Sequence, residues 1–448
     1  MKKVFIKAAI VISVLPLIFK GFLMFRNYTS YKNVIHKDAN KIVKIHVDGI
    51  IKSMAYNAIK NPSYYYNNSK KDKDTIDEPD KKGKGFGIPA NVFLYTIKGK
   101  SESTIFTSFK ISNAKDFKDY LKNEHSIYDS HTLKSITVAK SKDENVLVAY
   151  NDKQCVIAYN PNKDMVDNVF TDVLSDHKTL RHDNTLFSKL KDIDAHISFI
   201  AHDDVATINF NDGAVVIKGN ILLPEHIKIP TETTLPQFSD HSSVTFYMNV
   251  LSTKTQKKVT FKSFDIELDS INRYYKGSFA LETAGSTTQI DSIVTYEYND
   301  DFEKVEAYTL SEKQIPEITV QLSANSKGLM NYLENTNIIN SGMLNKAVFP
   351  LYQVKIDTTA MGLQASTNLV KSLPTKRLSH TECFALNVDF EKLKEQNQFP
   401  IITPFLGNLI HLKLKGSTTS GSNLQIEGKV QLKNENINAI AQLIFQKK

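Results

Sequence analysis

The chain has 448 residues, and 41% of them are hydrophobic, which is enough for one elongated or two compact domains with a core. Its two cysteines, Cys155 and Cys383, argue against a disulfide scaffold and a zinc site, and leave a single long-range bridge as an alternative. The net charge of +8 comes from scattered lysines without an arginine-rich block, which argues against nucleic-acid binding.

Residues 1–26 predict a membrane anchor. Early lysines precede the uncharged run Ala8–Phe19, and Val4–Phe25 approaches the roughly 20 apolar residues of a spanning helix if Lys20 reaches the far interface. No small-x-small cleavage site follows, and no cysteine is there to accept a lipid. We therefore expect an uncleaved signal-anchor in a bacterial inner membrane, with the N-terminus cytoplasmic and the body periplasmic. A cleaved signal and a buried core helix remain alternatives.

Residues 27–40 predict a short juxtamembrane stalk before the first unit of regular structure. A strand is expected over Ile42–Val47, and Asp48 is placed to cap the helix that follows. The apolar residues of this helix recur at helical spacing and are expected to be buried: Ile51, Met54, Ala55, Ala58 and Ile59.

The same order of strand, cap and helix recurs three times. The expected caps are Ser112 or Asn113, then Asn325 or Ser326, then Asp389. The apolar residues that follow these caps are Phe117, Tyr120 and Leu121; Leu329, Met330 and Leu333; and Leu393. These repeated units suggest related α+β modules, although their sequences differ too much to establish a duplication.

Strands of alternating character lie between these units. The N-D-G turn that ends at Gly213 predicts a hairpin, and residues 352–370 and 408–434 predict two more. In the last of these, Leu412 and Leu414 alternate with Lys413 and Lys415, so one face is expected to be packed and the other solvated. The segment after residue 434 returns to helical spacing.

The fold class predicted from this order is α+β, with mostly antiparallel sheets that carry helices on one side. We expect a first domain over residues 41–230, with a polar, solvated or disordered insert at 61–87. A weaker boundary at 228–243 leads to a second α+β domain over residues 240–448.

A cluster of histidines and aspartates over residues 176–204 is the strongest candidate for chemistry. Imidazoles and carboxylates are good metal ligands, but no H-E-x-x-H or similar frame makes them converge. His196 lies in an alternating run with Ser198 and Ile200, and His202 shares that face if the strand extends so far. The members of the cluster are His177, His182, His196, His202, Asp176, Asp183, Asp192, Asp194, Asp203 and Asp204.

Other motifs have simpler interpretations. The glycine-rich tract Lys81–Gly87 lacks the order of a phosphate-binding loop and predicts a flexible loop. The pairs Asp203–Asp204 and Asp300–Asp301 fall at expected turns, and no G-x-S-x-G elbow is present. We therefore assign no catalytic, cofactor-binding or metal-binding residue and no cofactor.

Several segments resemble a family of Gram-negative cell-envelope proteins of unknown function. They are DANKIVKIHVDGIIKSM, VFLYTIKG, STIFTSFKISNAKDFKDYLK, VLVAYNDKQCVIAYN and the strands before NENINAIAQLI. The resemblance covers most of the exported part and implies an envelope location, but no reaction and no site residues. Members often carry a lipobox cysteine, which this sequence lacks.

Together these patterns predict a non-enzymatic, membrane-anchored envelope protein whose β-rich body binds a partner protein, an anionic lipid or a cell-wall polymer. Two alternatives stay open. One is a metal-assisted hydrolase that uses residues 176–204, for which His182 and His202 would be required. The other is a periplasmic lipid carrier with a sheet lined by Phe, Ile and Leu.

Overall fold

The computed structural model describes residues 20–445, except residues 33, 74–82, 162–163, 182–183, 231, 254–258, 262–263, 267, 299–301, 370–374, 380–381, 398 and 419–421. The protein is α+β with mostly antiparallel sheets, as predicted. Its chain divides into two compact units, the first made of Met1–Asp212 with Asn436–Ala441 and the second of Gly213–Glu435 with Gln442–Lys448. The division therefore falls before the expected boundary at 228–243, and a short C-terminal segment returns to the first unit.

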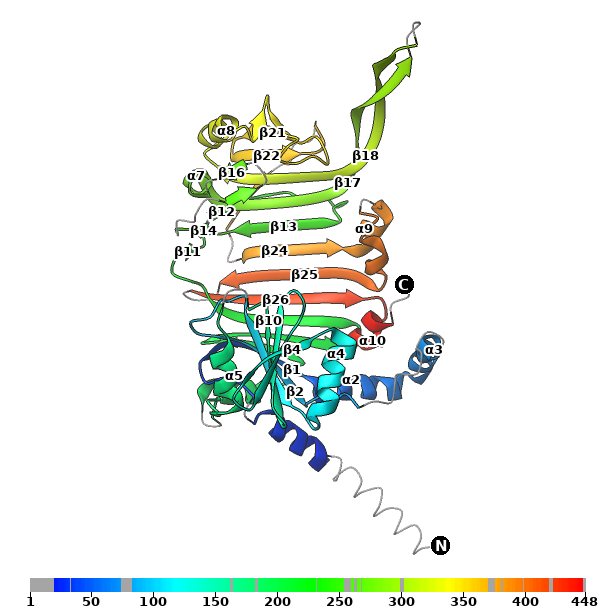
Figure 1. The fold of residues 1–448 in the computed structure, drawn as a ribbon. Coiled ribbons are helices and arrows are strands. Elements are labelled where there is room, and N and C mark those ends of the chain that lie inside the picture. Colours follow the sequence, from blue (N-terminus) through cyan, green and yellow to red (C-terminus); the bar gives the residue numbers. More distant parts are fainter. Residues whose placement is uncertain are drawn as a thin grey trace, which may run out of the picture. The chain divides into compact units, whose positions relative to one another are not determined.

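The first unit contains one antiparallel sheet in the strand order β9–β8–β1–β2–β3–β7–β6–β5–β4 (Figure 1). Its strands are β1 (Ala39–His46), β2 (Asn91–Ile97), β3 (Ile105–Lys110), β4 (Tyr128–Leu133), β5 (Ile136–Lys140), β6 (Val146–Tyr150), β7 (Gln154–Tyr159), β8 (Ile197–Ala201) and β9 (Asp204–Asn211).

Both faces of this sheet are covered in its β5–β7 part. On one face, helix α4 (Ala114–His125) packs Phe117 and Leu121 against Val148 and Cys155. The other face joins a larger core with helices α5 (Asp167–Leu174) and α6 (Thr185–Asp192). Consecutive residues of β6 and β7 belong to different clusters because strand side chains alternate between faces.

Residues 27–40 do not form the expected stalk. Residues 20–30 are helical, and the segment after them enters the core of the first unit, where Ile35 is 1% exposed. Tyr31 packs between Phe93 and Phe187, with both ring centroids 5.1 Å away. The sequence rule failed here because the apolar residues Tyr31, Val34 and Ile35 are too few and too irregularly spaced to predict a buried element.

Helix α2 (Val47–Lys60) differs from its prediction in both its cap and its buried face. Its N-cap residue is His46, without a side-chain cap, and Asp48 binds Arg26 instead. Ile51 and Ile59 are 56% and 79% exposed, while Asn57 is fully buried. The face of α2 that carries Asn57 points inward, because the Asn57 side chain forms hydrogen bonds with the backbone of the returning segment Asn436–Ala441.

The predicted insert at 61–87 is partly regular. Residues 62–73 form helix α3 (Pro62–Lys73), and residues 74–82 lie outside the described residues. In the glycine-rich tract, Gly85 accepts hydrogen bonds from the N–H groups of Ser112 and Asn113, at 2.8 and 3.2 Å. A Cβ atom at Gly85 would lie 2.4 Å from backbone atoms, so this tract fits against the start of α4 instead of forming a free loop.

In the second unit, antiparallel strands pair in the order β10–β26–β25–β24–β13–β17–β18–β22–β21–β20–β19 (Figure 1). These strands are β10 (Ala214–Leu222), β13 (Val244–Asn249), β17 (Tyr275–Tyr298), β18 (Lys304–Ala324), β19 (Ile339–Asn340), β20 (Met343–Leu344), β21 (Lys355–Thr359), β22 (Gly362–Ser366), β24 (Glu382–Asp389), β25 (Leu409–Thr418) and β26 (Asn423–Leu432).

Smaller elements border this sheet. The short pairs are β11 (Ile227–Lys228) with β14 (Leu251–Ser252), β12 (Glu232–Pro236) with β23 (Thr375–Ser379), and β15 (Val259–Phe261) with β16 (Phe264–Ile266). The helices are α7 (Leu268–Tyr274), α8 (Ser326–Asn335), α9 (Phe390–Gln396), the 3-10 helix η1 (Thr403–Leu406) and α10 (Ala439–Ile444). Strands β17 and β18 continue past Ser286 and Pro316 as a two-stranded ribbon that leaves the sheet (Figure 1).

Three of the four predicted helix caps are confirmed, each with one of the residues expected. Asn113 accepts hydrogen bonds from two N–H groups of α4, Asn325 accepts one from α8, and Asp389 accepts one from α9. The predicted hairpins β21–β22 and β25–β26 are also confirmed, and Gly213 has the positive φ of +69° expected of its turn. The suggested Cys155–Cys383 bridge is wrong, because both thiols are buried and free.

Candidate functional site

The described histidines and aspartates of residues 176–204 do not converge on one metal position. His177 and His202 adopt left-handed turn conformations, so the strand that carries Ile200 does not extend to His202. Asp203 lies 3.0 Å from Lys189, and His182 and Asp183 lie outside the described residues. Within the described part of the chain, no group of three His, Cys, Asp or Glu side chains is placed to hold a metal ion.

His196 and Asp194 share an environment with His46 from the end of β1. The His46 Nδ1 atom is 3.9 Å from an Asp194 carboxylate oxygen, and His196 Nδ1 accepts a hydrogen bond from the Phe210 N–H at 2.9 Å. Burial lowers the pKa of both imidazoles, and for His46 the charge of Lys44 lowers the pKa further. These are structural histidines that stay neutral near pH 7.

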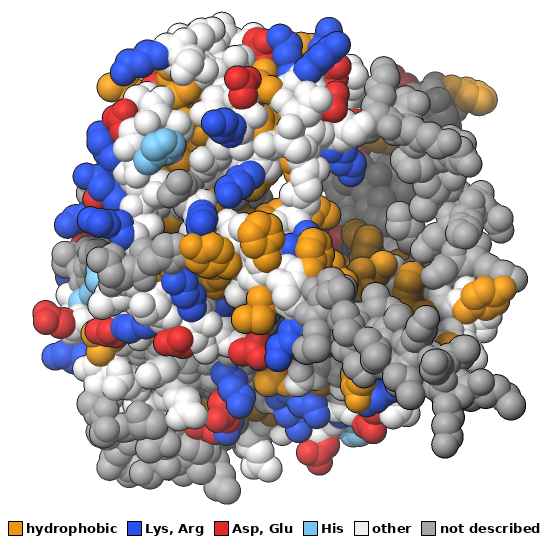
Figure 2. All heavy atoms as spheres, turned by 90° about the horizontal axis from the view of Figure 1, so that it is seen from below, with side chains coloured by type: hydrophobic (Ala, Val, Ile, Leu, Met, Phe, Trp, Pro, Cys, Tyr) orange, Lys and Arg blue, Asp and Glu red, His pale blue; other side chains and the backbone are white. Residues whose placement is uncertain are grey.

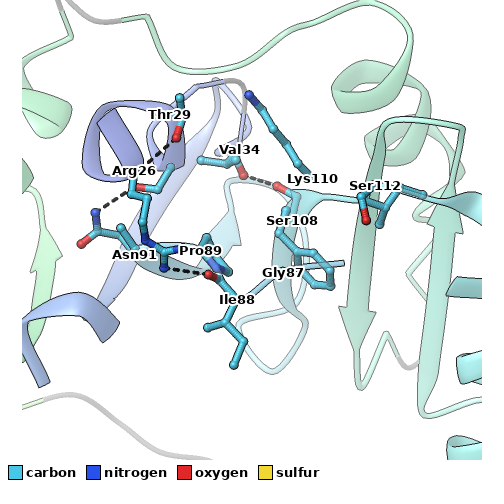
Figure 3. Close-up of a pocket in the computed structure, with 14 residues that line it drawn as sticks. Arg26, Thr29, Val34, Gly87, Ile88, Pro89, Asn91, Ser108, Lys110 and Ser112 are labelled. Carbon is cyan, nitrogen blue, oxygen red and sulfur yellow. Dashed lines mark hydrogen bonds between the residues drawn. The ribbon is translucent and has the colours of Figure 1, made fainter. Parts of the chain in front are cut away.

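A pocket of about 260 Å³ lies in the first unit, between the helix at 20–30, the chain leading into β2, and β3 (Figure 3). Arg26 lines it and donates to both Asp48 carboxylate oxygens, at 2.9 and 3.0 Å, and to the Ile88 carbonyl at 2.9 Å. Asn91 donates to Asn27 and Ser30, at 2.7 and 2.8 Å.

Several polar groups of this pocket, those of Arg26, Asn91 and Ser108, are therefore already paired within the chain. The Ser108 hydroxyl donates to the Val34 carbonyl, and the hydrogen bond to Asp48 raises the pKa of Arg26, which keeps its charge fixed there. The hydrogen bonds around the pocket hold the helix at 20–30 against the sheet. Few hydrogen-bonding groups of the pocket are left to bind a ligand.

The predicted membrane anchor reaches the described residues only at its end. Residues 4–19 lie outside them, and the helix at 20–30 exposes Phe22, Met24 and Phe25 by 54%, 64% and 62%. Among the helices of the described residues, none is long and apolar enough to span a membrane.

The second unit carries a different feature, a sheet face made of apolar side chains. Strand register places Ile217, Gly428, Leu414, Leu386, Phe246 and Leu281 in one row across β10, β26, β25, β24, β13 and β17. The neighbouring rows on the same face are also apolar. We call this surface the apolar face, and its side chains are Ile217, Ile221, Leu424, Ile426, Val430, Leu412, Leu414, Phe384, Leu386, Val388, Val244, Phe246, Met248, Phe279 and Leu281.

Two glycines make the apolar face continuous. A Cβ atom at Gly416 would lie 2.2 Å from the Phe384 ring, and one at Gly428 would lie 2.7 Å from a Leu414 methyl group. The side chains of Phe384 and Leu414 thus occupy the space above Gly416 and Gly428 on the adjacent strands.

Helices α7 and α8 cover one end of this face. Leu329 of α8 and Ile271 of α7 form a cluster with Leu322, Leu363 and Ile356 at the β18, β22 and β21 end. From β10 to β17 the apolar side chains are half-buried, and none belongs to a cluster of buried side chains among the described residues.

The opposite face of the same strands is polar and hollowed. Side chains around an open hollow of about 700 Å³ come from β10, β26, β25, β24 and β13. We call this hollow the lysine groove, and its polar side chains are Lys218, Tyr247, Glu382, Asn387, Lys413, Lys415, Glu427 and Lys429.

Elsewhere on the surface, charge is dispersed. Figure 2 shows one face of the molecule on which hydrophobic side chains gather near the middle and lysine and arginine side chains are scattered around them. The alternation of Leu412 and Leu414 with Lys413 and Lys415 predicted two unlike faces for one hairpin. Sequence reasoning missed the site because pairing with β10, β24, β13 and β17 is what extends those faces across the sheet.

No family model matches the chain, and no curated protein matches its sequence. Two solved structures, crystal forms IV and III of TP0453, show a weak similarity, each with a TM-score of 0.26. Form IV is 9% identical over 41% of this chain and 77% of its own, and form III is 10% identical over 93% and 98%. At this level the similarity carries no inference about fold or function.

Proposed function

We propose that the protein is a non-enzymatic binding protein of the bacterial cell envelope whose apolar face binds the acyl chain of a lipid. The observation that supports this most is the row of half-buried apolar side chains from Ile217 on β10 to Leu281 on β17. Contiguous apolar surface is costly in water, at about 25 cal/mol per Å², and it usually marks an interaction site.

The chemistry of the face favours an acyl chain over a protein partner. Protein interfaces carry about one hydrogen bond for each 100–200 Å². The central row of the apolar face has no side chain that donates or accepts a hydrogen bond, since it consists of aliphatic residues, Phe246 and Gly428. A hydrocarbon chain needs only such contacts.

The proposal includes membrane anchoring through residues 4–25, with the body in the periplasm. Support comes from the apolar N-terminal sequence and from the exposed Phe22, Met24 and Phe25 at its end. The ion pair between Arg26 and Asp48 holds this helix directly against the first unit. A tether of this kind would keep the protein close to the lipids that it binds.

Titration with a fluorescent fatty acid such as cis-parinaric acid tests the binding function. The test protein is a double variant that carries Leu386→Gln and Leu414→Gln. These two residues are direct cross-strand partners on β24 and β25. We expect saturable binding by the wild-type protein and about thirtyfold weaker binding by the double variant, because each of the two lost apolar contacts contributes about 1 kcal/mol.

Leu310→Gln is the matched control, since Leu310 is 73% exposed on the ribbon and lies outside the apolar face. It should bind the fatty acid like the wild type. Melting temperatures of the ligand-free proteins separate ligand contact from core packing. Absence of saturable binding, or equal affinity of the double variant and the wild type, would contradict the proposal.

A further inference from the structure

Two lysines face each other in the lysine groove. Lys413 of β25 and Lys429 of β26 are direct cross-strand partners, and both side chains are exposed. Like charges directly opposite each other on neighbouring strands destabilise a sheet, by an amount comparable to the gain from an opposite pair. This position therefore breaks a local rule, as residues at functional sites often do.

No counter-ion lies beside this pair in the part of the chain that the structure describes. Lys413, Lys429 and Lys218 form no ion pair with any residue that the structure describes, whereas Lys415 lies 3.3 Å from Glu427. The other acidic side chain of the groove, Glu382, is engaged by the Tyr247 hydroxyl, which donates to it at 2.5 Å. Three lysine charges thus remain available around one hollow.

A neighbouring histidine responds to the same positive field. His411 precedes Lys413 by two residues on β25, so both side chains lie on the same face. Its pKa is lowered first by burial and then by the charge of Lys413, with a smaller contribution from Lys392 against the opposing effect of Asp389. The charge of Lys413 therefore reaches the neighbouring position on β25.

We propose that the lysine groove binds a phosphate-bearing anion between Lys413 and Lys429. Lysine ammonium groups bind phosphate as point charges, whereas flat carboxylates are usually recognised by the fork of an arginine, and this groove contains none. Asn387 lies beside Lys413 in the same row and provides an uncharged hydrogen-bond donor.

This site is separate from the apolar face, because the sheet itself lies between them. An amphiphile with its acyl chain on the apolar face cannot place its headgroup between these lysines through the backbone of β25 and β26. The inference therefore concerns a second ligand and does not depend on the proposed lipid-binding function.

Isothermal titration of the full protein with inorganic tripolyphosphate tests this site. We expect one saturable site that weakens as salt increases, and about a tenfold loss of affinity for each lysine removed in Lys413→Gln and Lys429→Gln. Lys355→Gln is the control, since the Lys355 side chain is 42% exposed in the same sheet but already lies 3.2 Å from Asp357. It should change the affinity less than twofold.

Sedimentation with vesicles, with and without phosphatidic acid, distinguishes the sources of phosphate. Lysine-dependent binding to phosphatidic acid vesicles as well as to tripolyphosphate would assign a lipid headgroup, and binding to the soluble anion alone would assign a free or polymeric phosphate. The inference is overturned if no saturable binding is seen, or if the double lysine variant binds the anion as the wild type does.

Discussion

His196 couples protonation to a backbone hydrogen bond in the first unit. Its Nδ1 atom accepts from the Phe210 N–H, and its ring stacks on the Phe210 ring with centroids 5.9 Å apart. Burial lowers its pKa below the ordinary 6.5, so the unfolded chain binds a proton at a higher pH than the folded protein does. The protonation of His196 therefore leaves the free energy of unfolding unchanged well above pH 6.5 and lowers it as the pH drops below that value.

We predict that His196→Asn reduces this acid sensitivity. The asparagine oxygen can replace Nδ1 as acceptor but does not titrate. Urea unfolding at pH 7 and pH 5 should show a smaller loss of stability for the variant than for the wild type. His46 also has a lowered pKa and retains its share of the loss. Equal losses in the two proteins would contradict the role given to His196.

At the scale of single elements, local signals predicted helix starts well and buried faces less well. Asn113 caps α4 as expected because its side chain needs only the N–H groups two and three residues later, those of Lys115 and Asp116. The buried face of α2 could not be predicted, because Asn57 points inward and accepts a hydrogen bond from the N–H of Asn438. These two residues lie 381 positions apart in the sequence. Helical spacing alone would have buried Ile51 and Ile59.

Loss of the α4 cap gives a prediction of known size. Asn113→Ala should lower the free energy of unfolding by about 1 kcal/mol, because two N–H groups of the first turn lose their acceptor. Asn113→Asp keeps an acceptor oxygen and should stay close to the wild type. Denaturant unfolding measures both, and an alanine variant as stable as the aspartate variant would show that the cap contributes nothing.

For the whole molecule, the alternating pattern predicted the fold class but not the candidate site. The alternating residues of strands such as β25 predict one apolar and one charged face. Whether those sides meet a core or a ligand depends on the order and register of strands from β10 to β17, which turns and propensities do not specify. The return of Asn436–Ala441 to the first unit is equally non-local, with Asn438 fully buried there.

The strands from β10 to β17 form a sheet with two chemically different faces. The apolar face presents hydrocarbon side chains over six strands, and the lysine groove presents Lys218, Lys413 and Lys429 on the reverse side. The two ligands that we propose would lie on opposite faces, so substitutions that remove one binding site leave the residues of the other unchanged.

Photo-crosslinking with a fatty acid that carries a diazirine on its acyl chain tests the central claim most directly. After irradiation and proteolysis, mass spectrometry identifies the labelled peptides. The account predicts labels on β13, β24, β25 and β26 at residues of the apolar face, such as Phe246, Leu386 and Leu414, with competition by unlabelled fatty acid. Labelling confined to the first unit or the ribbon, or labelling that excess fatty acid does not reduce, would contradict it.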